Sequence, residues 1–230
     1  MKKNTLLLMI LTLFSTTINA QNNYDDLWRK VEKLEIDNLP KSALKIVNEI
    51  YDVAEKNNNS QQIIKSLFYQ SKFSIILEEN AHLKIINNFK KHISKSNFPT
   101  KNVLQNVLAN LYWQYFNENR YKFYNRTKTT NKVDKNDFRT WGLNTLFKEI
   151  NSQFKISLND SEKLQKIKIQ EFSDILQINK ESKIYKPTLF DFLANNALDF
   201  YKSSETSITR ANYKFILDNA TYLSGFKTFS

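Results

Sequence analysis

The stretch "PTKNVLQNVLANLYWQYFNENRYKFYNRT", residues 99–127, decides the fold of this chain. Pro99 predicts a helix start, because proline is favoured at the first position of a helix, and the helix should end near Glu118. Apolar residues recur every four positions in two adjacent rows, which is the period of a helix with a wide buried face. The rows are Val103–Val107–Leu111–Tyr115 and Leu104–Leu108–Tyr112–Phe116. We therefore interpret the aromatic rings of residues 112–116 as helix core.

The second half of the stretch differs, because it follows the polar break at residues 117–119. Two aromatic residues alternate there with two basic ones, which predicts an extended segment with one apolar side. Together with the nearby "FRTW" at 138–141, this segment is our predicted protein-contact surface. Its residues are Arg120, Tyr121, Phe123, Arg126, Arg139 and Trp141. We do not predict nucleic-acid binding, since lysines outnumber arginines 29 to 5 and base and phosphate recognition favours arginine.

Four further helices are predicted before residue 99. They cover residues 22–37, 40–56, 61–78 and 81–95, with Ser60 as the cap of the third. The first helices of successive pairs start near residues 24, 61 and 100, a spacing of 37–39 residues. This spacing predicts an all-α fold in which antiparallel helical hairpins stack as a solenoid similar to tetratricopeptide repeats, whose units are about 34 residues long. An irregular antiparallel bundle gives the same spacing and stays an alternative.

The chain divides into four predicted parts. Residues 1–20 are a signal peptide, 21–126 the helical-hairpin repeat region, 127–137 a polar loop and 138–230 a second helical region that is either separate or continuous with the first. In the third helix the predicted inward residues are Ile64, Leu67, Phe68, Ser71 and Ile75. Later helices are predicted near residues 143–158 and 169–177, and Thr188 and Asp191 have the spacing of a capping box.

The first 20 residues have the pattern of a secretory signal. Lys2 and Lys3 precede an apolar run at residues 6–14, and the segment ends on small residues that predict cleavage after Ala20. The apolar run is shorter than the roughly 20 residues that span a bilayer. We therefore predict an exported protein that is periplasmic, or soluble at the cell surface, and has no transmembrane segment. The net charge of the whole chain is +11, which suggests an anionic partner, but the excess of lysine over arginine is better explained by an AT-rich coding sequence.

Composition argues against most enzyme classes. With only two glycines, Gly142 and Gly225, the chain has no phosphate-binding loop, dinucleotide fingerprint or nucleophile elbow. It has no cysteine, and its two histidines, His82 and His92, would lie roughly 15 Å apart on one helix. We predict no catalytic residues, no cofactor and no metal. Acidic and amide side chains at every fourth position near the end are interpreted as the solvated stripe of a buried helix; they are Asp191, Asn195 and Asp199.

Four blocks of the sequence carry a resemblance to a known family. They are "YDDLWRKVEKLEIDNLPKSALKIVNEIYDVAEKNNN" (24–59), "LYWQYFNENRYKFYNRT" (111–127), "DFRTWGLNTL" (137–146) and "KPTLFDFLANNALDFY" (186–201). In this order they resemble the N-terminal region of large bacterial alpha-2-macroglobulin-like proteins, over residues 24 to about 217. Members of that family are exported protease traps, in which a protease cuts a bait segment and many members then capture it through a Cys-x-Glu-Gln thioester.

The bait and thioester regions of the family follow the part that this chain resembles, and a chain without cysteine has no thioester. The resemblance therefore implies the helical N-terminal part of such an inhibitor, and we expect a fragment or a truncated gene. We predict a non-catalytic exported protein-interaction module, whose partner is the downstream macroglobulin domains of a parent chain or a protease. The alternatives are a free-standing periplasmic helical-repeat adaptor of an envelope complex and, third, an exported hydrolase.

Overall fold

The computed structural model describes residues 24–124, 134, 136–176 and 184–203, and within these ranges every regular element is a helix. The prediction of an all-α fold is confirmed. The first helix covers residues 24–36 and precedes α2. The other α-helices are α2 (Pro40–Lys56), α3 (Ser60–Leu77), α4 (Ala81–Lys95), α5 (Thr100–Glu118), α6 (Arg120–Tyr124), α7 (Leu143–Ser157), α8 (Ser161–Leu164) and α10 (Leu189–Lys202). Two 3₁₀ turns, η1 (Phe138–Thr140) and η2 (Ile169–Phe172), lie among these helices, and residues 184–185 are also helical.

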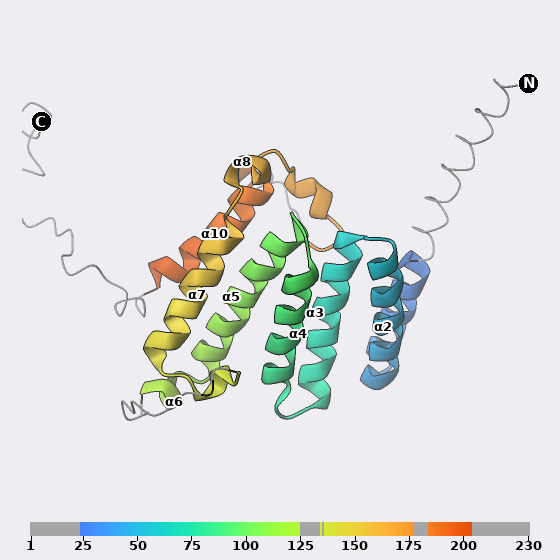
Figure 1. Ribbon diagram of the computed structural model, residues 1–230. Coiled ribbons are helices and arrows are strands. Elements are labelled where there is room, and N and C mark those ends of the chain that lie inside the picture. The colour runs from blue at the N-terminus through green and yellow to red at the C-terminus, as the bar shows by residue number, and fades with distance from the viewer. Residues whose placement is uncertain (1–23, 125–133, 135, 177–183, 204–230) are drawn as a thin grey trace, which may run out of the picture.

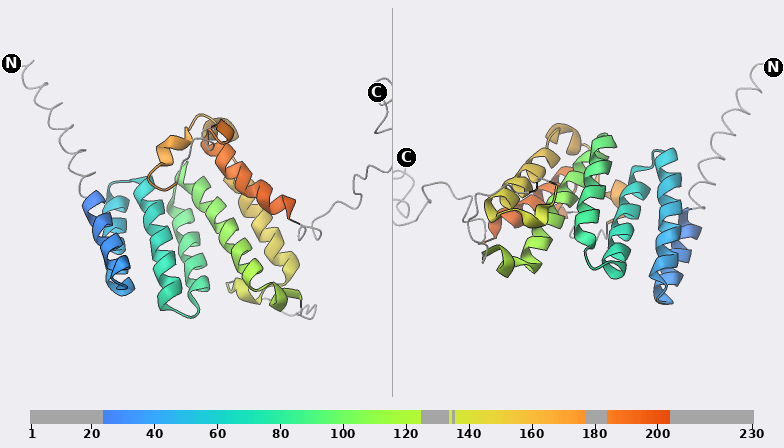
Figure 2. Two further views of the ribbon diagram at one scale, coloured as in Figure 1. Left: turned by 180° about the vertical axis from the view of Figure 1, so that it is seen from behind. Right: turned by 60° about the horizontal axis from the view of Figure 1, so that its bottom comes forward.

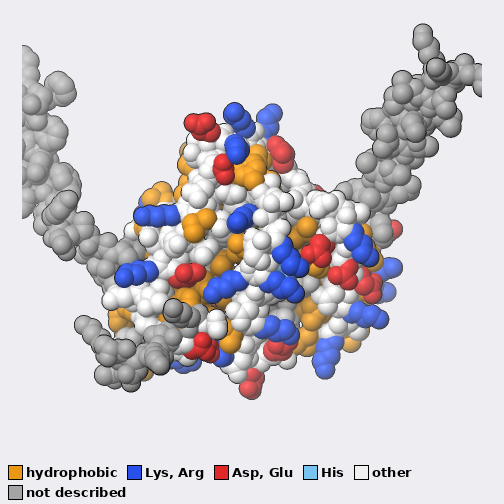
Figure 3. All heavy atoms as spheres, in the orientation of Figure 1, with side chains coloured by type: hydrophobic (Ala, Val, Ile, Leu, Met, Phe, Trp, Pro, Cys, Tyr) orange, Lys and Arg blue, Asp and Glu red, His pale blue; other side chains and the backbone are white. Residues whose placement is uncertain are grey.

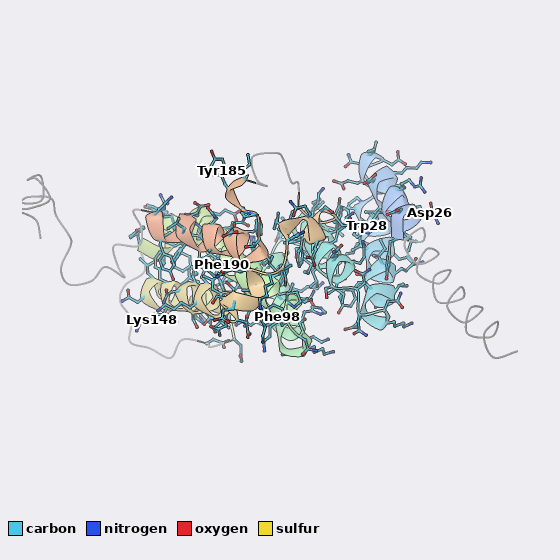
Figure 4. The ribbon with its side chains drawn as sticks, turned by 90° about the horizontal axis from the view of Figure 1, so that it is seen from above. Asp26, Trp28, Phe98, Lys148, Tyr185 and Phe190 are labelled. Carbon is cyan, nitrogen blue, oxygen red and sulfur yellow. The ribbon has the colours of Figure 1, made fainter. Side chains whose placement is uncertain are left out.

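The long helices pack on one another in chain order, α2 on α3, α3 on α4, α4 on α5 and α5 on α7 (Figure 1). Helices α2, α4 and α7 lie on the face nearest the viewer in Figure 1, and helix 24–36, α3 and α5 lie behind them, as the reverse view in Figure 2 shows. Helix α10 packs against α5 from that second side. Seen from above, α10 with Phe190 and α7 with Lys148 lie at one end of the molecule, and Trp28 lies near the other (Figure 4). The result is a row of helical hairpins, closed at one end by α10.

Buried apolar side chains form two clusters, and α3 contributes to both. Phe73 belongs to the smaller cluster, which it shares with helix 24–36 and α2. Ile64 and Leu67 belong to the larger cluster, which continues through α4, α5 and α7 to Phe200 in α10. The larger cluster thus contains side chains that come before and after residues 127–137 in the sequence.

Helix α5 is the centre of the larger cluster and is buried over most of its length. Tyr112 and Phe116 are completely buried, and Trp113 stacks on Phe116 with ring centroids 5.3 Å apart. The ring of Trp113 also meets those of Phe147 and Phe200, which come from α7 and α10. The interpretation of these aromatic residues as core is confirmed.

Two details of the third predicted helix were wrong. Ser60 is its first residue, and the cap is Asn59, whose side chain accepts a hydrogen bond from the backbone N–H of Gln62. Phe68 and Ile75, predicted to face inward, are 37% and 52% exposed. The physical reason is that α3 touches two cores, so the buried face changes along the helix instead of following one stripe.

Later in the chain, the predicted helix near residues 169–177 is only the short turn η2. The capping box at α10 is confirmed, because Thr188 Oγ1 accepts from the backbone of Asp191 and the Asp191 carboxylate accepts from the backbone of Thr188. The predicted signal peptide, Arg126, most of the predicted polar loop and residues 204–230 lie outside the described residues. Within the described ranges, no helix combines the length and the apolar character that crossing a membrane requires.

Candidate functional site

The predicted contact segment at residues 120–126 is not extended. Its described part forms α6, in which Phe123 is 4% exposed and Tyr121 is 81% exposed. Phe123 is buried because its ring packs on Phe116, with centroids 5.7 Å apart, and on Tyr115, at 6.1 Å. A single helical turn after α5 therefore folds back on the core. The alternation of aromatic and basic residues, over so few positions, did not distinguish a helical turn from a strand.

The two predicted contact residues after residue 137 have structural partners. Trp141 is 6% exposed, its ring packs beside those of Tyr112 and Phe138, and its indole N–H donates to the backbone oxygen of Asp134 at 2.9 Å. The Arg139 guanidinium donates to both carboxylate oxygens of Asp137, at 2.8 and 2.7 Å. Phe123 and Trp141 thus pack the core, while Arg120 and Tyr121 lie on the surface.

A groove of about 370 Å³ lies where α3, α5, α10 and residues 172–176 meet, and we call it the apolar groove. Apolar side chains dominate its lining, together with four amides, and none of its lining residues is charged. They are Ile64, Phe68, Val103, Asn106, Val107, Asn110, Leu111, Gln114, Phe172, Ile175, Leu176, Leu189, Phe192, Leu193 and Asn196. Its volume is within the range of small-ligand pockets.

A buried amide in the lining of the apolar groove, Asn106, forms hydrogen bonds to two other helices. Its Nδ2 donates to Ser157 Oγ at 3.1 Å and to the backbone oxygen of Leu193 at 3.0 Å. Its Oδ1 accepts from Asn196 Nδ2 at 2.9 Å. These bonds fix α5 to the end of α7 and to α10. They therefore set the distance between the helices that line the groove.

The sequence contained a signal for this groove that we missed. That signal is the amide row Asn106–Asn110–Gln114, which lies beside the apolar row Val103–Val107–Leu111. Both rows line the groove. Residues four apart on a helix are about 6 Å apart along the axis, so the amides form an evenly spaced line.

A second groove, of about 420 Å³, lies on the opposite face between α2 and α4, and we call it the polar groove. Its lining consists mainly of amides, hydroxyls and lysines, and contains no carboxylate. The lining residues are Leu44, Asn48, Gln70, Ser71, Ser74, Lys84, Ile85, Asn87, Asn88 and Lys91. Figure 3 views this face and shows basic side chains over its middle.

A chain of side-chain hydrogen bonds crosses the three helices beneath the polar groove. Gln70 of α3 bonds to Asn48 of α2 at 2.9 Å and to Asn88 of α4 at 3.4 Å. His92 follows, 3.1 Å from Asn88 Oδ1 and 2.9 Å from the hydroxyl of Tyr51. Burial lowers the pKa of His92 below its usual value, and the nearby Glu55 partly opposes this. Burial and the bond to Glu55 raise the pKa of Tyr51 above its usual range.

The described residues contain no cluster of three or more acidic or histidine side chains that could hold a metal ion. The acidic residues of α10 do not act as a pair, since Asp191 is part of the helix cap and Asp199 is exposed. His82 lies beside Tyr115 and 3.5 Å from Glu118. These groups have local structural roles.

The fold and its grooves define an all-helical protein with two ligand-sized depressions, one apolar and uncharged, the other polar and basic. Comparison of the chain with family models, with curated proteins and with solved structures found no match to any of them.

Proposed function

We propose that this chain is a non-catalytic protein-interaction module that holds a short, uncharged, apolar peptide segment of a partner protein in the apolar groove. The observation that carries the proposal is the lining, in which eleven apolar side chains and four amides are present and charge is absent. Burial of an unpaired charge against such a surface is costly, so the lining selects an uncharged segment.

The apolar side chains supply the binding free energy. Phe68 is partly exposed although it lies beside the core, and Val107, Leu111 and Phe192 are only partly buried. Covering such apolar area stabilises a complex by about 25 cal/mol per Å² before the costs of association are subtracted. A segment with two or three apolar side chains would fill a groove of about 370 Å³.

The amide side chains of the lining recognise the backbone of the bound segment. Asn110 donates through its Nδ2 to the Asn106 backbone oxygen at 3.1 Å and to Asn106 Oδ1 at 3.4 Å, and its Oδ1 can accept from another donor. Gln114, four residues further along α5, is exposed. Their axial spacing of about 6 Å is close to the 6.6–6.8 Å that two residues span in a strand. Each amide can therefore meet a peptide group on the same side of an extended segment.

The resemblance to the N-terminal region of alpha-2-macroglobulin-like proteins supports the same class of function and suggests a source for the segment. In this proposal the partner is the downstream macroglobulin-type part of a parent chain. Sequencing the DNA that follows this coding region tests this proposed source of the peptide segment. Macroglobulin-type domains, in frame or after a frameshift, are expected, and an intact stop followed by an unrelated gene would count against it.

Selection of nine-residue peptides by phage display on the purified chain tests the binding function itself. The selected peptides should lack charge and carry apolar residues at alternate positions. Their dissociation constants, measured by calorimetry, should rise at least tenfold with Leu111→Lys, because a buried ammonium replaces an apolar contact. Asn110→Ala should weaken binding about three- to tenfold, the size of one lost hydrogen bond.

Ile76→Lys is the matched control, because Ile76 is a well-exposed apolar residue of α3 that does not line the groove. Circular dichroism must show the same helix content in all variants. Selected peptides that are charged, or that bind Leu111→Lys and wild type equally well, would contradict the proposal.

A further inference from the structure

We propose that the apolar groove is filled by this chain's own segment 219–226, which a partner segment must displace before it binds. The segment has the sequence "NATYLSGF" and lies outside the described residues. The proposal rests on the function proposed above, because it concerns the same groove, and it adds the regulation of that groove by the chain itself.

Charge complementarity selects this segment. Residues 219–226 are the longest uncharged run after α10, and Asp218 and Lys227 bound it. The groove lining is also without charge, so it accepts an uncharged segment at the lowest desolvation cost. The apolar residues just before this run are interrupted by Lys214. Residues 4–20 are uncharged as well, but they are the predicted signal peptide, which we expect to be removed.

The apolar side chains of the segment have a spacing that fits the groove. In an extended segment Ala220, Tyr222 and Phe226 point to one side, because side chains alternate between the two sides. The four residues from Tyr222 to Phe226 span about 13 Å, at about 3.3 Å per residue. The amide row of the lining, from Asn106 to Gln114, spans about 12 Å along α5. Two aromatic rings therefore reach the two ends of the groove.

Helix α10 brings the segment close to the groove. Leu189, Phe192, Leu193 and Asn196 of α10 line the groove, and the helix ends at Lys202. The end of α10 is therefore only about 9 Å along the helix axis from Asn196. The sixteen residues 203–218 span up to about 50 Å when extended, so they are long enough for the chain to return.

The covalent connection makes weak contacts sufficient. A short flexible linker gives an effective concentration of about 1 mM, so a segment whose free peptide has a dissociation constant of about 0.1 mM fills the groove about tenfold more often than not. An added peptide must compete with the tethered segment. Its apparent affinity should therefore be about tenfold lower than for an open groove.

Calorimetric titration of the full chain with the acetylated and amidated peptide NATYLSGF tests the proposal. Tyr222→Asp places a charge in the tethered segment, so this variant should bind the added peptide about tenfold more tightly than wild type does. Tyr213→Asp is the matched control, since it places the same charge outside the segment, and it should bind as wild type does. Adding Leu111→Lys to Tyr222→Asp should abolish binding, because Leu111 lines the groove.

The titration separates this proposal from the function on which it rests. If phage-selected peptides bind wild type and Tyr222→Asp equally well and still require Leu111, the groove binds peptides but the chain does not occupy it. The proposal is also overturned if such peptides bind and NATYLSGF does not. If neither kind of peptide binds any variant, the proposed function fails together with this regulation.

Disulfide formation locates the segment directly, because the natural chain contains no cysteine. Gln114→Cys combined with Ser224→Cys should form a disulfide within one chain under mild oxidation, since a disulfide requires the two Cα atoms within about 7 Å. Ile76→Cys combined with Ser224→Cys is the control, because Ile76 does not line the groove, and it should react much more slowly. Equal rates in the two pairs, or a disulfide that joins two chains, would contradict occupation of the groove by the chain's own segment.

Discussion

Tyr51 and His92 join α2 to α4 through a hydrogen bond of 2.9 Å between the Tyr51 hydroxyl and His92 Nδ1. Their rings meet edge to face, with centroids 5.0 Å apart. Helix α2 belongs to the smaller core and α4 to the larger one, so this contact links the two hydrophobic clusters. The stability of that link should depend on pH.

We expect the free energy of unfolding to fall as the pH decreases below about 6.5. Burial lowers the pKa of His92 in the folded chain, so the unfolded state, with its usual value near 6.5, binds the proton more tightly. The stabilisation is fully present above pH 6.5 and is lost as the pH falls toward the lower pKa of the folded state. Urea unfolding at pH 7.5, 6.5 and 5.5 measures this loss.

His92→Gln supplies the control for the pH dependence. This variant lacks the titrating group, so the difference in unfolding free energy between it and wild type should change across this pH window. A constant difference at all three values would contradict the shift in the pKa of His92.

Asn106→Ala should destabilise the fold by about 2–3 kcal/mol. The substitution leaves the backbone oxygen of Leu193 without its buried donor and removes the acceptor of Asn196. Asn195→Ala is the comparison, because that half-buried amide only donates to the backbone of its own helix, and it should cost less than about 0.5 kcal/mol. Urea unfolding compares the two, and equal costs would mean that Asn106 does not hold the helices together.

Tyr112→Phe should be neutral or stabilise the protein by up to about 1 kcal/mol. Tyr112 is completely buried in the core, and its hydroxyl has no hydrogen-bond partner among the described residues. Removal of an unsatisfied buried hydroxyl relieves a desolvation cost. Tyr51→Phe should instead lower stability by about 1 kcal/mol, since that hydroxyl bonds to both Glu55 and His92. A loss in Tyr112→Phe as large as that in Tyr51→Phe would be inconsistent with an unpartnered hydroxyl.

Local signals in the sequence predicted the positions of the helices well. Pro40 and the apolar period after it predicted α2 with the bounds that the structure shows, and α4 was predicted equally well. Proline, asparagine breaks and the four-residue period act within one or two turns, so a single segment contains the information. The same holds for the capping box between Thr188 and Asp191.

Relationships between distant segments were not predictable in this way. Helix α5 packs against α7, although residues 127–137 separate the two helices in the sequence. Neither segment contains a local signal that predicts this pairing. The exposure of Ile75 followed from a second core beside α3, which only the tertiary structure reveals. The polar groove is formed in part by Asn48, Gln70 and Asn88, which come from three helices. In the sequence, each of them has the pattern of an ordinary surface residue.

Thr188→Ala should lower the stability of α10 by about 1 kcal/mol, the usual value of a helix cap. The Thr188 hydroxyl donates to the Asp191 carboxylate at 2.7 Å and accepts from the Asp191 N–H, so alanine leaves the first turn with an unsatisfied donor. Leu189 and Leu193, in that part of the helix, line the apolar groove. Hydrogen exchange should therefore become faster in the first turns of α10 and stay unchanged in α7. Thr188→Ser, which keeps the hydroxyl, should behave nearly as wild type, and faster exchange in both helices would show that the cap acts on the whole fold instead of on α10.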